Sequence, residues 1–371
     1  MSGLAIEDTD GTLNMLQESV QVFARAFPGT QGLRQLRETQ TVIDQRQWQE
    51  MSSAGWLGLL LPEDLGGAGL GVAEQVVLSY ALGEHLITSP IATSSVLASA
   101  ILAFLPKHAE RSRLAEVVVS GQTLVIPVLN KVFSLEKQGE AYLISGQSDY
   151  IEAFTAATDL ILRAQDNTGQ DYILSMPTDA FGIENKQHRA VDGTTLSVLN
   201  LHQVIVAENQ ILAQGCLHTL LEQAEDFGRL ALAAELAGIA SQLVKMTSEY
   251  MQQREQFGQP IAKFQVIQHR LVDMWADAEF ACAAIDNAVE RLARQHDIDA
   301  HLAVLAAKIR ANESATSVGR RAVHLYGAMG FTAECDIGLY LKRAINLAAT
   351  LGSAEPLRLQ FVQKERAQKA A

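Results

Sequence analysis

The sequence predicts an α+β protein in which two helical regions flank a central β region. Apolar residues recur at helical spacing in the first third of the chain and again after about residue 213. Between them, short runs rich in Val, Ile, Leu and Tyr alternate with turn residues. We therefore expect helices over residues 1–122, strands over 123–212 and helices over 213–371. A chain of 371 residues is long enough for two or three domains.

The first region is predicted to contain a helix that ends near Gly58 and a second apolar helix from about Ala73 to His85. Trp48 and Trp56 belong to the apolar face of the first helix. The glycine-rich segment 59–71 between the helices follows a helix and lacks a βαβ pattern. It is therefore interpreted as a turn and not as a phosphate-binding loop.

The uncharged stretch 86–105 raises the question of a membrane span. It contains Pro90 and several Ser and Thr residues, and it is a single stretch of this kind. Small residues interleaved with Leu, Val and Ile are more typical of helices buried in a large core. Residues 1–14 also lack the basic start of a secretory signal. We expect no membrane partner.

The middle region is predicted to form a small antiparallel β domain. Its candidate strands are six short runs separated by Gly, Asp and Asn: TLVIPVL, AYLIS, GQSDYI, DLILRAQ, DYILSM and LHQVIV.

The last region is predicted to form a bundle of long antiparallel helices over 217–251, 260–296 and 298–325. Pro260 is expected at the start of the second helix, where its missing N–H has no cost. The first and third helices are apolar over more than one face. We therefore expect a dimer or tetramer with the bundle faces as the interface.

Charge and cysteine usage exclude several functions. The 29 basic and 42 acidic residues give a net charge of −13, which disfavours nucleic acid as a partner. The three cysteines are widely spaced and favour a reducing cytoplasm. No metal-binding motif and no nucleophile elbow occur in the sequence, so neither a metal site nor a hydrolase is indicated.

Two segments of the last region are candidates for ligand binding. The segment 254–265 combines Arg254, Phe257 and Gln265 between two helices. An arginine and a glutamine near a helix start can hold a pyrophosphate, and a phenylalanine can stack on a purine. The same residues could equally be a helix connection whose phenylalanines fill the core. The segment 324–334 contains glycines that allow close approach of a backbone or a ligand.

Three blocks together resemble the acyl-CoA dehydrogenase family: GWLGLLLPEDLGGAGLG, REQFGQPIAKFQVIQHRLVDM and AVHLYGAMGFTAECDIGLYLKRA. The resemblance covers nearly the whole chain. It implies an N-terminal helical domain, a central β-barrel and a C-terminal four-helix bundle. It also implies FAD-dependent α,β-dehydrogenation of an acyl-CoA in lipid or steroid breakdown, with electron-transfer flavoprotein as the electron acceptor.

The resemblance further assigns cofactor-binding residues. Arg254 and Gln265 match positions that grip the pyrophosphate of a neighbouring subunit's FAD, and Phe257 matches the aromatic residue beside them. His324 stands where the family usually has Gln, and both side chains can donate a hydrogen bond. Gly327 and Ala328 stand at the two glycine positions of the same block.

The catalytic base is the main departure from the family. Its usual Glu-Gly-Thr is replaced by Leu351-Gly352-Ser353, and a second known location is Gly228. Glu235 shares a helix face with Gly228 and is flanked by Leu, Ala, Ile and Gly. Such a desolvated carboxylate suits a base working near neutral pH. The alternative is a structural glutamate paired with an Arg or Lys of a neighbouring helix.

The β region departs as well. The family's flavin-contacting loop is shortened near 130–135, and Tyr150-Ile151-Glu152 replaces the family's Trp-Ile-Thr beside the flavin ring. An acid there is a poor partner for an anionic reduced flavin. The Ala-Glu at 234–235, without a Glu-Gly-Thr, resembles the branch of the family with heteromeric steroid side-chain dehydrogenases and pimeloyl-CoA dehydrogenase small subunits. We therefore expect one subunit of a heterotetramer with a paralogous dehydrogenase. The alternative is a non-catalytic partner subunit that completes the paralogue's FAD site.

Overall fold

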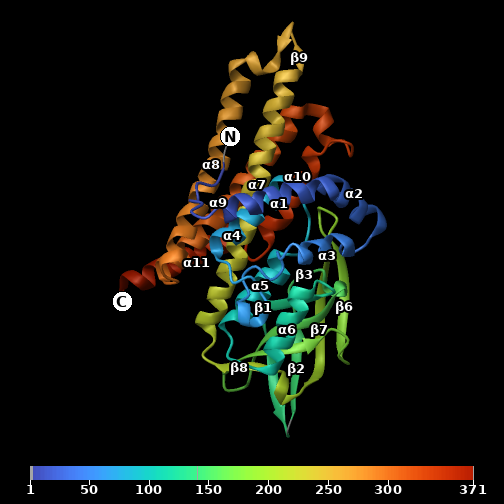
Figure 1. Ribbon diagram of the computed structural model, residues 1–371, viewed down its shortest axis with the longest axis vertical. Coiled ribbons are helices and arrows are strands. Elements are labelled where there is room, and N and C mark those ends of the chain that lie inside the picture. The colour runs from blue at the N-terminus through green and yellow to red at the C-terminus, as the bar shows by residue number, and fades with distance from the viewer. Residues whose placement is uncertain (1–2, 140, 371) are drawn as a thin grey trace. The chain divides into compact units, whose positions relative to one another are not determined.

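The computed structural model describes residues 3–139 and 141–370 (Figure 1). Its element order is the predicted one: helices, then strands, then helices. The helices of the first region are α1 (Thr12–Ala26), α2 (Gly29–Thr39), α3 (Gln45–Ser53), η1 (Glu63–Leu65), α4 (Val72–Glu84), η2 (Ala92–Val96), α5 (Leu97–Phe104) and α6 (Ala109–Ser120).

The first helix of the Trp48 pattern ends earlier than expected. It stops at Ser53 and not near Gly58. Gly55 adopts a left-handed φ of 78°, a conformation that glycine reaches without steric cost and that ends a helix. The glycine-rich segment that follows is a turn around η1, as predicted. The uncharged stretch 86–105 contains η2 and α5, both buried almost throughout.

The strands are β1 (Leu124–Gln138), β2 (Ala141–Gln147), β3 (Ile151–Glu152), β4 (Ala157–Gln165), β5 (Asp171–Pro177), β6 (Ile183–Arg189), β7 (Thr195–Val206) and β8 (Ile211–Gly215), with η3 (Phe154–Ala156) and η4 (Glu208–Gln210) between them. They form one sheet in the order β3-β7-β2-β1-β4-β5-β8, with β6 also paired to β7.

The sheet is mixed and not purely antiparallel as predicted, because β1 and β4 pair in parallel. Two strands were missed in the sequence. Strand β6 is exposed along most of its length, so it lacks the apolar alternation on which the prediction relied. Strand β8 is short and follows directly on η4.

The helices of the last region are α7 (His218–Gln253), α8 (Gln265–Arg294), α9 (Ile298–Tyr326), α10 (Ile337–Ala349) and α11 (Ala354–Ala370), with η5 (Ile261–Lys263) and η6 (Gly327–Phe331). Helices α7 and α8 lie side by side and are joined by the hairpin β9 (Glu255–Gln256) and β10 (Gln259–Pro260) (Figure 1). Pro260 therefore lies in the hairpin and precedes η5, whereas the long helix begins at Gln265.

Two glycines set the position of α7 against α4. A Cβ added to Gly83 would lie 2.1 Å from the carbonyl oxygen of Glu235, and one added to Gly238 would lie 2.0 Å from that of Tyr80. The two backbones therefore touch, which only glycine permits. This contact fixes the turn of α7 that carries Glu235.

The apolar faces of α7 and α9 are buried within the chain itself. Residues 229–241 of α7 are buried without interruption. The premise that these faces exceed what the chain's own core needs is therefore wrong, and the dimer or tetramer stays a prediction. Large apolar side chains are instead exposed on α8 and η6: Val266, Val272, Trp275, Phe280, Met329 and Phe331.

One described helix, α7, is long and apolar enough to span a membrane, but 83% of its apolar window is buried inside the protein. That burial is typical of a core helix.

The chain separates into two compact units that do not follow the chain order. One comprises Met1–Arg34, Val72–Thr88 and Arg229–Ala371, and the other comprises Gln35–Gly71 and Ser89–Gly228. The three boundaries predicted from the sequence stay a prediction.

Candidate functional site

Glu235, the candidate base, forms a buried ion pair. Its Oε1 accepts a hydrogen bond of 3.0 Å from Nε of Arg343 on α10. The two side chains are 6% and 1% exposed. A buried carboxylate requires such a partner, because the cost of removing it from water is otherwise uncompensated. Glu235 is therefore paired with an arginine of a neighbouring helix, as expected if it were a structural glutamate. The catalytic role of Glu235 stays a prediction.

Lys308 of α9 is a second buried cation close to this pair. Its Nζ donates to Oδ1 of Asn312 at 2.6 Å and to the carbonyl oxygen of Leu347 at 3.0 Å. Burial and the charge of Arg229 lower the pKa of Lys308 to about 7, although the charge of Glu235 acts in the opposite direction.

The same residues hold the turn between α10 and α11. Arg229 donates from Nε to the carbonyl oxygen of Leu351 at 3.3 Å, and Asn312 donates from Nδ2 to that of Gly352 at 3.2 Å. Leu351 has a left-handed φ of 51°. This turn, Leu351-Gly352-Ser353, carries no acid. We call the five residues that meet here the inner cluster: Arg229, Glu235, Lys308, Asn312 and Arg343.

Arg254 lies at the end of α7, against the end of α9. Its Nη1 donates to the hydroxyl of Tyr250 at 3.0 Å and to the carbonyl oxygen of Tyr326 at 3.1 Å. The rings of Tyr250 and Tyr326 stack with centroids 4.1 Å apart. Within the described chain, Nε and Nη2 of Arg254 have no hydrogen-bond acceptor. The guanidinium is therefore held by one nitrogen and keeps its other donors available.

Phe257 and Gln265 flank Arg254 on exposed backbone. Phe257 is 90% exposed and has a left-handed φ of 54°, which is unusual for a bulky residue. Its ring meets that of Phe264 edge-on at 6.0 Å. Gln265 is exposed and is the first residue of α8, whose N-terminal amides favour anions. The alternative in which Phe257 fills the core is wrong.

His324 lies near the end of α9 and faces α8. Its Nδ1 is 3.3 Å from Nη1 of Arg270. Gly327 follows with φ 65° and ψ −141°, and a Cβ added there would lie 3.8 Å from Nη1 of Arg254. Ala328 is exposed in η6. We call the residues at this end of the helices the outer cluster: Arg254, Phe257, Gln265, Arg270, His324, Gly327 and Ala328.

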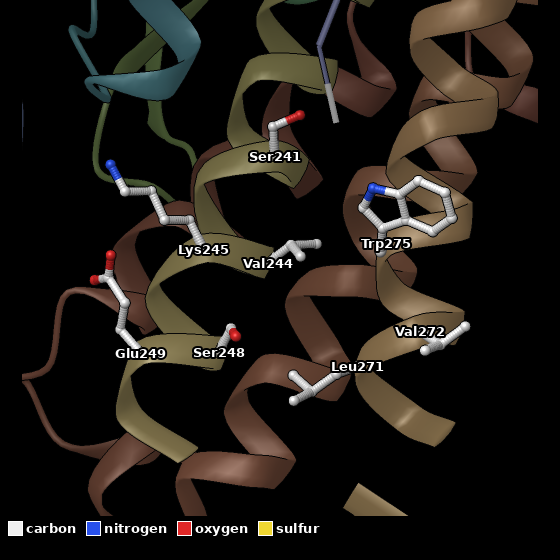
Figure 2. A pocket seen from close by; sticks show the side chains of 8 residues that line it. All are labelled: Ser241, Val244, Lys245, Ser248, Glu249, Leu271, Val272 and Trp275. Carbon is white, nitrogen blue, oxygen red and sulfur yellow. The ribbon is translucent and has the colours of Figure 1, made fainter. Parts of the chain in front are cut away.

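A groove of about 390 Å³ lies between α7 and α8. Figure 2 shows Val244 of α7 and Leu271 of α8 pointing toward one another across it, while Lys245 and Glu249 point to the other side of α7. No residue of the inner or outer cluster lines this groove.

Glu84, at the end of α4, is a further perturbed acid. Burial raises the pKa of Glu84 to about 7, and the charge of Lys245 opposes this shift only in part. The position of Glu84 is fixed through its backbone, because the Tyr340 hydroxyl donates to its carbonyl oxygen at 2.8 Å.

In the β region, the segment 130–135 is part of one long strand and not a loop. Strand β1 runs through it with a register shift between Val128 and Phe133. Glu152 of β3 accepts a hydrogen bond from Oγ1 of Thr93 at 3.2 Å. The segment 130–135 thus lies within a strand whose pairing to β4 is irregular, and Glu152 has a hydroxyl partner.

Arg343, Lys308 and Arg270 were not identified from the sequence. The first two carried a usable signal, because each occupies an apolar helix face: Arg343 lies four residues from Leu339 and Leu347, and Lys308 lies four from Val304. A charged residue on such a face predicts a buried ion pair. Arg270 carries no comparable signal, because it is an exposed arginine on an exposed face.

Comparisons with known proteins agree with this arrangement. The family models "Acyl-CoA dehydrogenase, N-terminal domain" and "Acyl-CoA dehydrogenase, C-terminal domain" match residues 11–122 and 205–364. The chain is 26% identical to acyl-CoA dehydrogenase IpdE2 of Mycolicibacterium smegmatis over 339 residues, 91% of this chain and 94% of that protein.

Among solved structures, a variant of the Tcur3481-Tcur3483 steroid ACAD superposes with a TM-score of 0.87 at 28% identity, covering 97% of this chain and 99% of that one. The ChsE4-ChsE5 complex from Mycobacterium tuberculosis shares the fold, with a TM-score of 0.87 at 24% identity over 97% and 98% of the two chains. With helices, sheet and helices in the same order, and with two models of one family covering both helical regions, the chain belongs to the acyl-CoA dehydrogenase family.

Proposed function

We propose that the protein is one subunit of a heteromeric, FAD-dependent acyl-CoA dehydrogenase that acts on a steroid-type acyl-CoA. As a member of the family it is an acyl-CoA dehydrogenase-type oxidoreductase, and the family's enzymes are FAD flavoproteins. The steroid substrate class rests on the Tcur3481-Tcur3483 similarity, and the heteromer on that pair and on the ChsE4-ChsE5 complex.

The observation that carries the proposal is the outer cluster. Arg254 is anchored by one nitrogen and offers its remaining N–H groups to an anion. Gly327 leaves the space beside Arg254 without a side chain, and Phe257 stands in solvent beside them. A diphosphate and an adenine fit this combination of free donors, open backbone and exposed aromatic face.

In this proposal the chain's own residues bind and orient the cofactor. Arg254 and Gln265 hold the diphosphate, Phe257 packs on the adenine, and His324 donates a further hydrogen bond. FAD, when bound, supplies the hydride acceptor. Because all these residues lie at the exposed ends of helices, they are placed to serve a flavin shared with a second subunit.

The inner cluster favours a second candidate, the non-catalytic partner subunit. The Glu235 carboxylate is paired with Arg343, and the turn at Leu351 carries no acid. If the base of the reaction belongs to the paralogous subunit, this chain would complete its FAD site without removing the substrate proton. If Glu235 is the base, its carboxylate takes the α-proton although Oε1 accepts a hydrogen bond from Arg343.

The test is to count flavins and locate the base. The chain purified alone and together with a paralogous dehydrogenase is measured for FAD per chain by absorbance. We expect one flavin per heterodimer and little or none on the isolated chain. One FAD per chain on the isolated protein, together with acyl-CoA dehydrogenation, would contradict the heteromer.

Glu235→Gln then separates the two candidates, since glutamine keeps the shape and removes the base. Loss of turnover with retained FAD supports Glu235 as the base. Full activity in the heteromer assigns the base to the paralogue and Glu235 to structure.

The remaining parts of the proposal follow from the reaction class. Electrons removed from the substrate must leave through a soluble carrier, for which we propose an electron-transfer flavoprotein. We propose the cytoplasm as the place of action, in line with three cysteines that form no disulfide among the described residues.

A further inference from the structure

The contact between Arg270 and His324 determines which imidazole nitrogen carries the proton. Arg270 Nη1 lies 3.3 Å from His324 Nδ1. A guanidinium is always protonated and has donors only, with no acceptor. Nδ1 must therefore accept, which requires its lone pair to be free of a proton. The ring is then the neutral tautomer that carries its hydrogen on Nε2.

The tautomer decides what His324 can offer a ligand. With Nδ1 occupied by Arg270, the remaining polar group is an N–H donor at Nε2. A glutamine at this place would also present an N–H donor at the end of its side chain. In contrast, the other neutral tautomer would present an acceptor at Nε2 and would repel an anionic oxygen.

We infer that Arg270 is a positioning residue that holds His324 in the Nε2–H tautomer, so that His324 donates a hydrogen bond to an anionic oxygen of the cofactor. The ligand class is a diphosphate, and the inference rests on the proposed function for the identity of that ligand. Arg270 acts through His324, and its own charge adds to the attraction.

The immediate surroundings of the pair contain a suitable control. Arg320, one helical turn before His324 on α9, is also exposed, and the described residues give it no hydrogen bond or ion pair. Arg320→Met removes the same charge as Arg270→Met from the same end of the helices. It leaves the Nδ1 contact in place.

The first measurement reads the tautomer directly and needs no cofactor. The full-length chain is labelled with ¹⁵N-histidine, and the resonance of His324 among the nine histidines is identified by its loss in His324→Gln. We expect the Nε2–H pattern in the native chain and in Arg320→Met, and a mixture of tautomers in Arg270→Met. A native Nδ1–H pattern, or no change in Arg270→Met, would overturn the inference.

The second measurement tests what the tautomer is for, with ADP as the probe because it contains the diphosphate and adenine. Arg270→Met should weaken ADP binding by about two- to tenfold, the range of a single hydrogen bond. In a His324→Gln background the same substitution should weaken binding much less, because an amide needs no tautomer to be fixed. An equal loss in both backgrounds would show that Arg270 acts only as a charge and would overturn the positioning role.

The two measurements distinguish failure of the positioning role of Arg270 from failure of the proposed cofactor site. If the tautomer responds to Arg270 as expected but no variant of Arg254, His324 or Arg270 changes ADP affinity, the cofactor assignment of the outer cluster is wrong. The inferred hydrogen bond from His324 to the cofactor would then also be wrong.

Discussion

The inner and outer clusters each contain two arginines, and they differ in the groups that those arginines contact. In the inner cluster, the guanidinium of Arg343 and the ammonium of Lys308 meet carboxylate, amide and carbonyl oxygens of the chain itself. In the outer cluster, Arg254 donates hydrogen bonds to the protein from one nitrogen only, and Gln265 and Phe257 are exposed to solvent. The charged groups of Glu235, Lys308 and Arg343 have partners within the chain, whereas Nε and Nη2 of Arg254 are available to a ligand.

This difference predicts that the inner cluster contributes to the stability of the fold and the outer cluster to cofactor binding. A buried polar group without a partner costs several kcal/mol, so a chain that buries Arg343 and Lys308 must also bury their acceptors. An exposed donor costs almost nothing to keep. Substitutions in the inner cluster should therefore act on folding, and those in the outer cluster on cofactor retention.

The largest effect is expected for Arg343→Met. Glu235 would lose the hydrogen bond from Nε while staying buried, and breaking one side of a buried ion pair costs about 3–5 kcal/mol. Urea denaturation followed by circular dichroism measures the free energy of unfolding.

A double variant controls for this result. Glu235→Gln combined with Arg343→Met removes both charges, and it should recover much of the lost stability. A loss below about 1 kcal/mol in Arg343→Met would mean that the pair is not the main support of this part of the core.

The second effect concerns Arg254→Ala. Removal of a charge-assisted contact to the diphosphate should weaken FAD binding by about 1.5–3 kcal/mol, roughly tenfold to a hundredfold. Flavin retained by the complex after gel filtration is measured by absorbance, while the helical circular dichroism signal should not change.

Arg320→Ala is the matched control for Arg254→Ala, because it removes an exposed arginine of α9 that makes no hydrogen bond within the described chain. Equal flavin content in the Arg254 variant and the control would return Arg254 to a structural role at the end of α9.

The third effect is a pH dependence from Lys308. Its pKa is about 7 in the fold and near 10.5 in a free lysine, so the unfolded chain binds more protons between these values. Stability should therefore rise with pH above 7, by at most about 1.4 kcal/mol per pH unit for one proton. Lys308→Met should remove this slope between pH 7 and 9 in urea denaturation.

Glu84 supplies the opposite slope at lower pH and serves as the internal control. Its folded pKa of about 7 lies above the ordinary 4.5, so its contribution to stability is lost as pH rises from about 4.5 to 7. Lys308→Met should leave that lower window unchanged. A slope above pH 7 that persists in Lys308→Met would show that another group titrates there.

The sequence predicted the positions of the secondary-structure elements better than the contacts between buried polar side chains. The sequence located α7, α8 and α9 to within a few residues, because each is a long run of apolar residues at helical spacing. It missed β6, whose residues are exposed and lack that pattern. It identified Glu235 as a buried acid, but not Arg343 as its partner, because they are 108 positions apart and meet only through packing.

Only part of the outer cluster was singled out by local spacing, whereas His324, Gly327 and Ala328 were assigned by the resemblance to the family and Arg270 was not identified. Arg254, Phe257 and Gln265 fall within one short segment, so the sequence alone places them together. His324 and Gly327 meet them only because α9 ends beside α7 and α8. The roles of all these residues stay predictions, since the fold shows their position and not their ligand.

The smallest effect on folding is expected for Phe257→Ala. This variant tests most directly whether the outer cluster serves binding and not stability. Phe257 is 90% exposed and holds a left-handed φ of 54°, so its ring adds little to the core and its backbone is mildly strained. Its removal should change the free energy of unfolding by less than about 0.5 kcal/mol. Flavin or ADP affinity should nevertheless fall by about 0.5–1.5 kcal/mol, the range of an aromatic stacking contact.

Phe264 contacts Phe257 but is only partly exposed, so Phe264→Ala should cost stability as well as affinity. If Phe257→Ala destabilises the fold as much as Phe264→Ala does, the exposed aromatic supports the hairpin and not a ligand, and the outer cluster loses its clearest sign of a binding function.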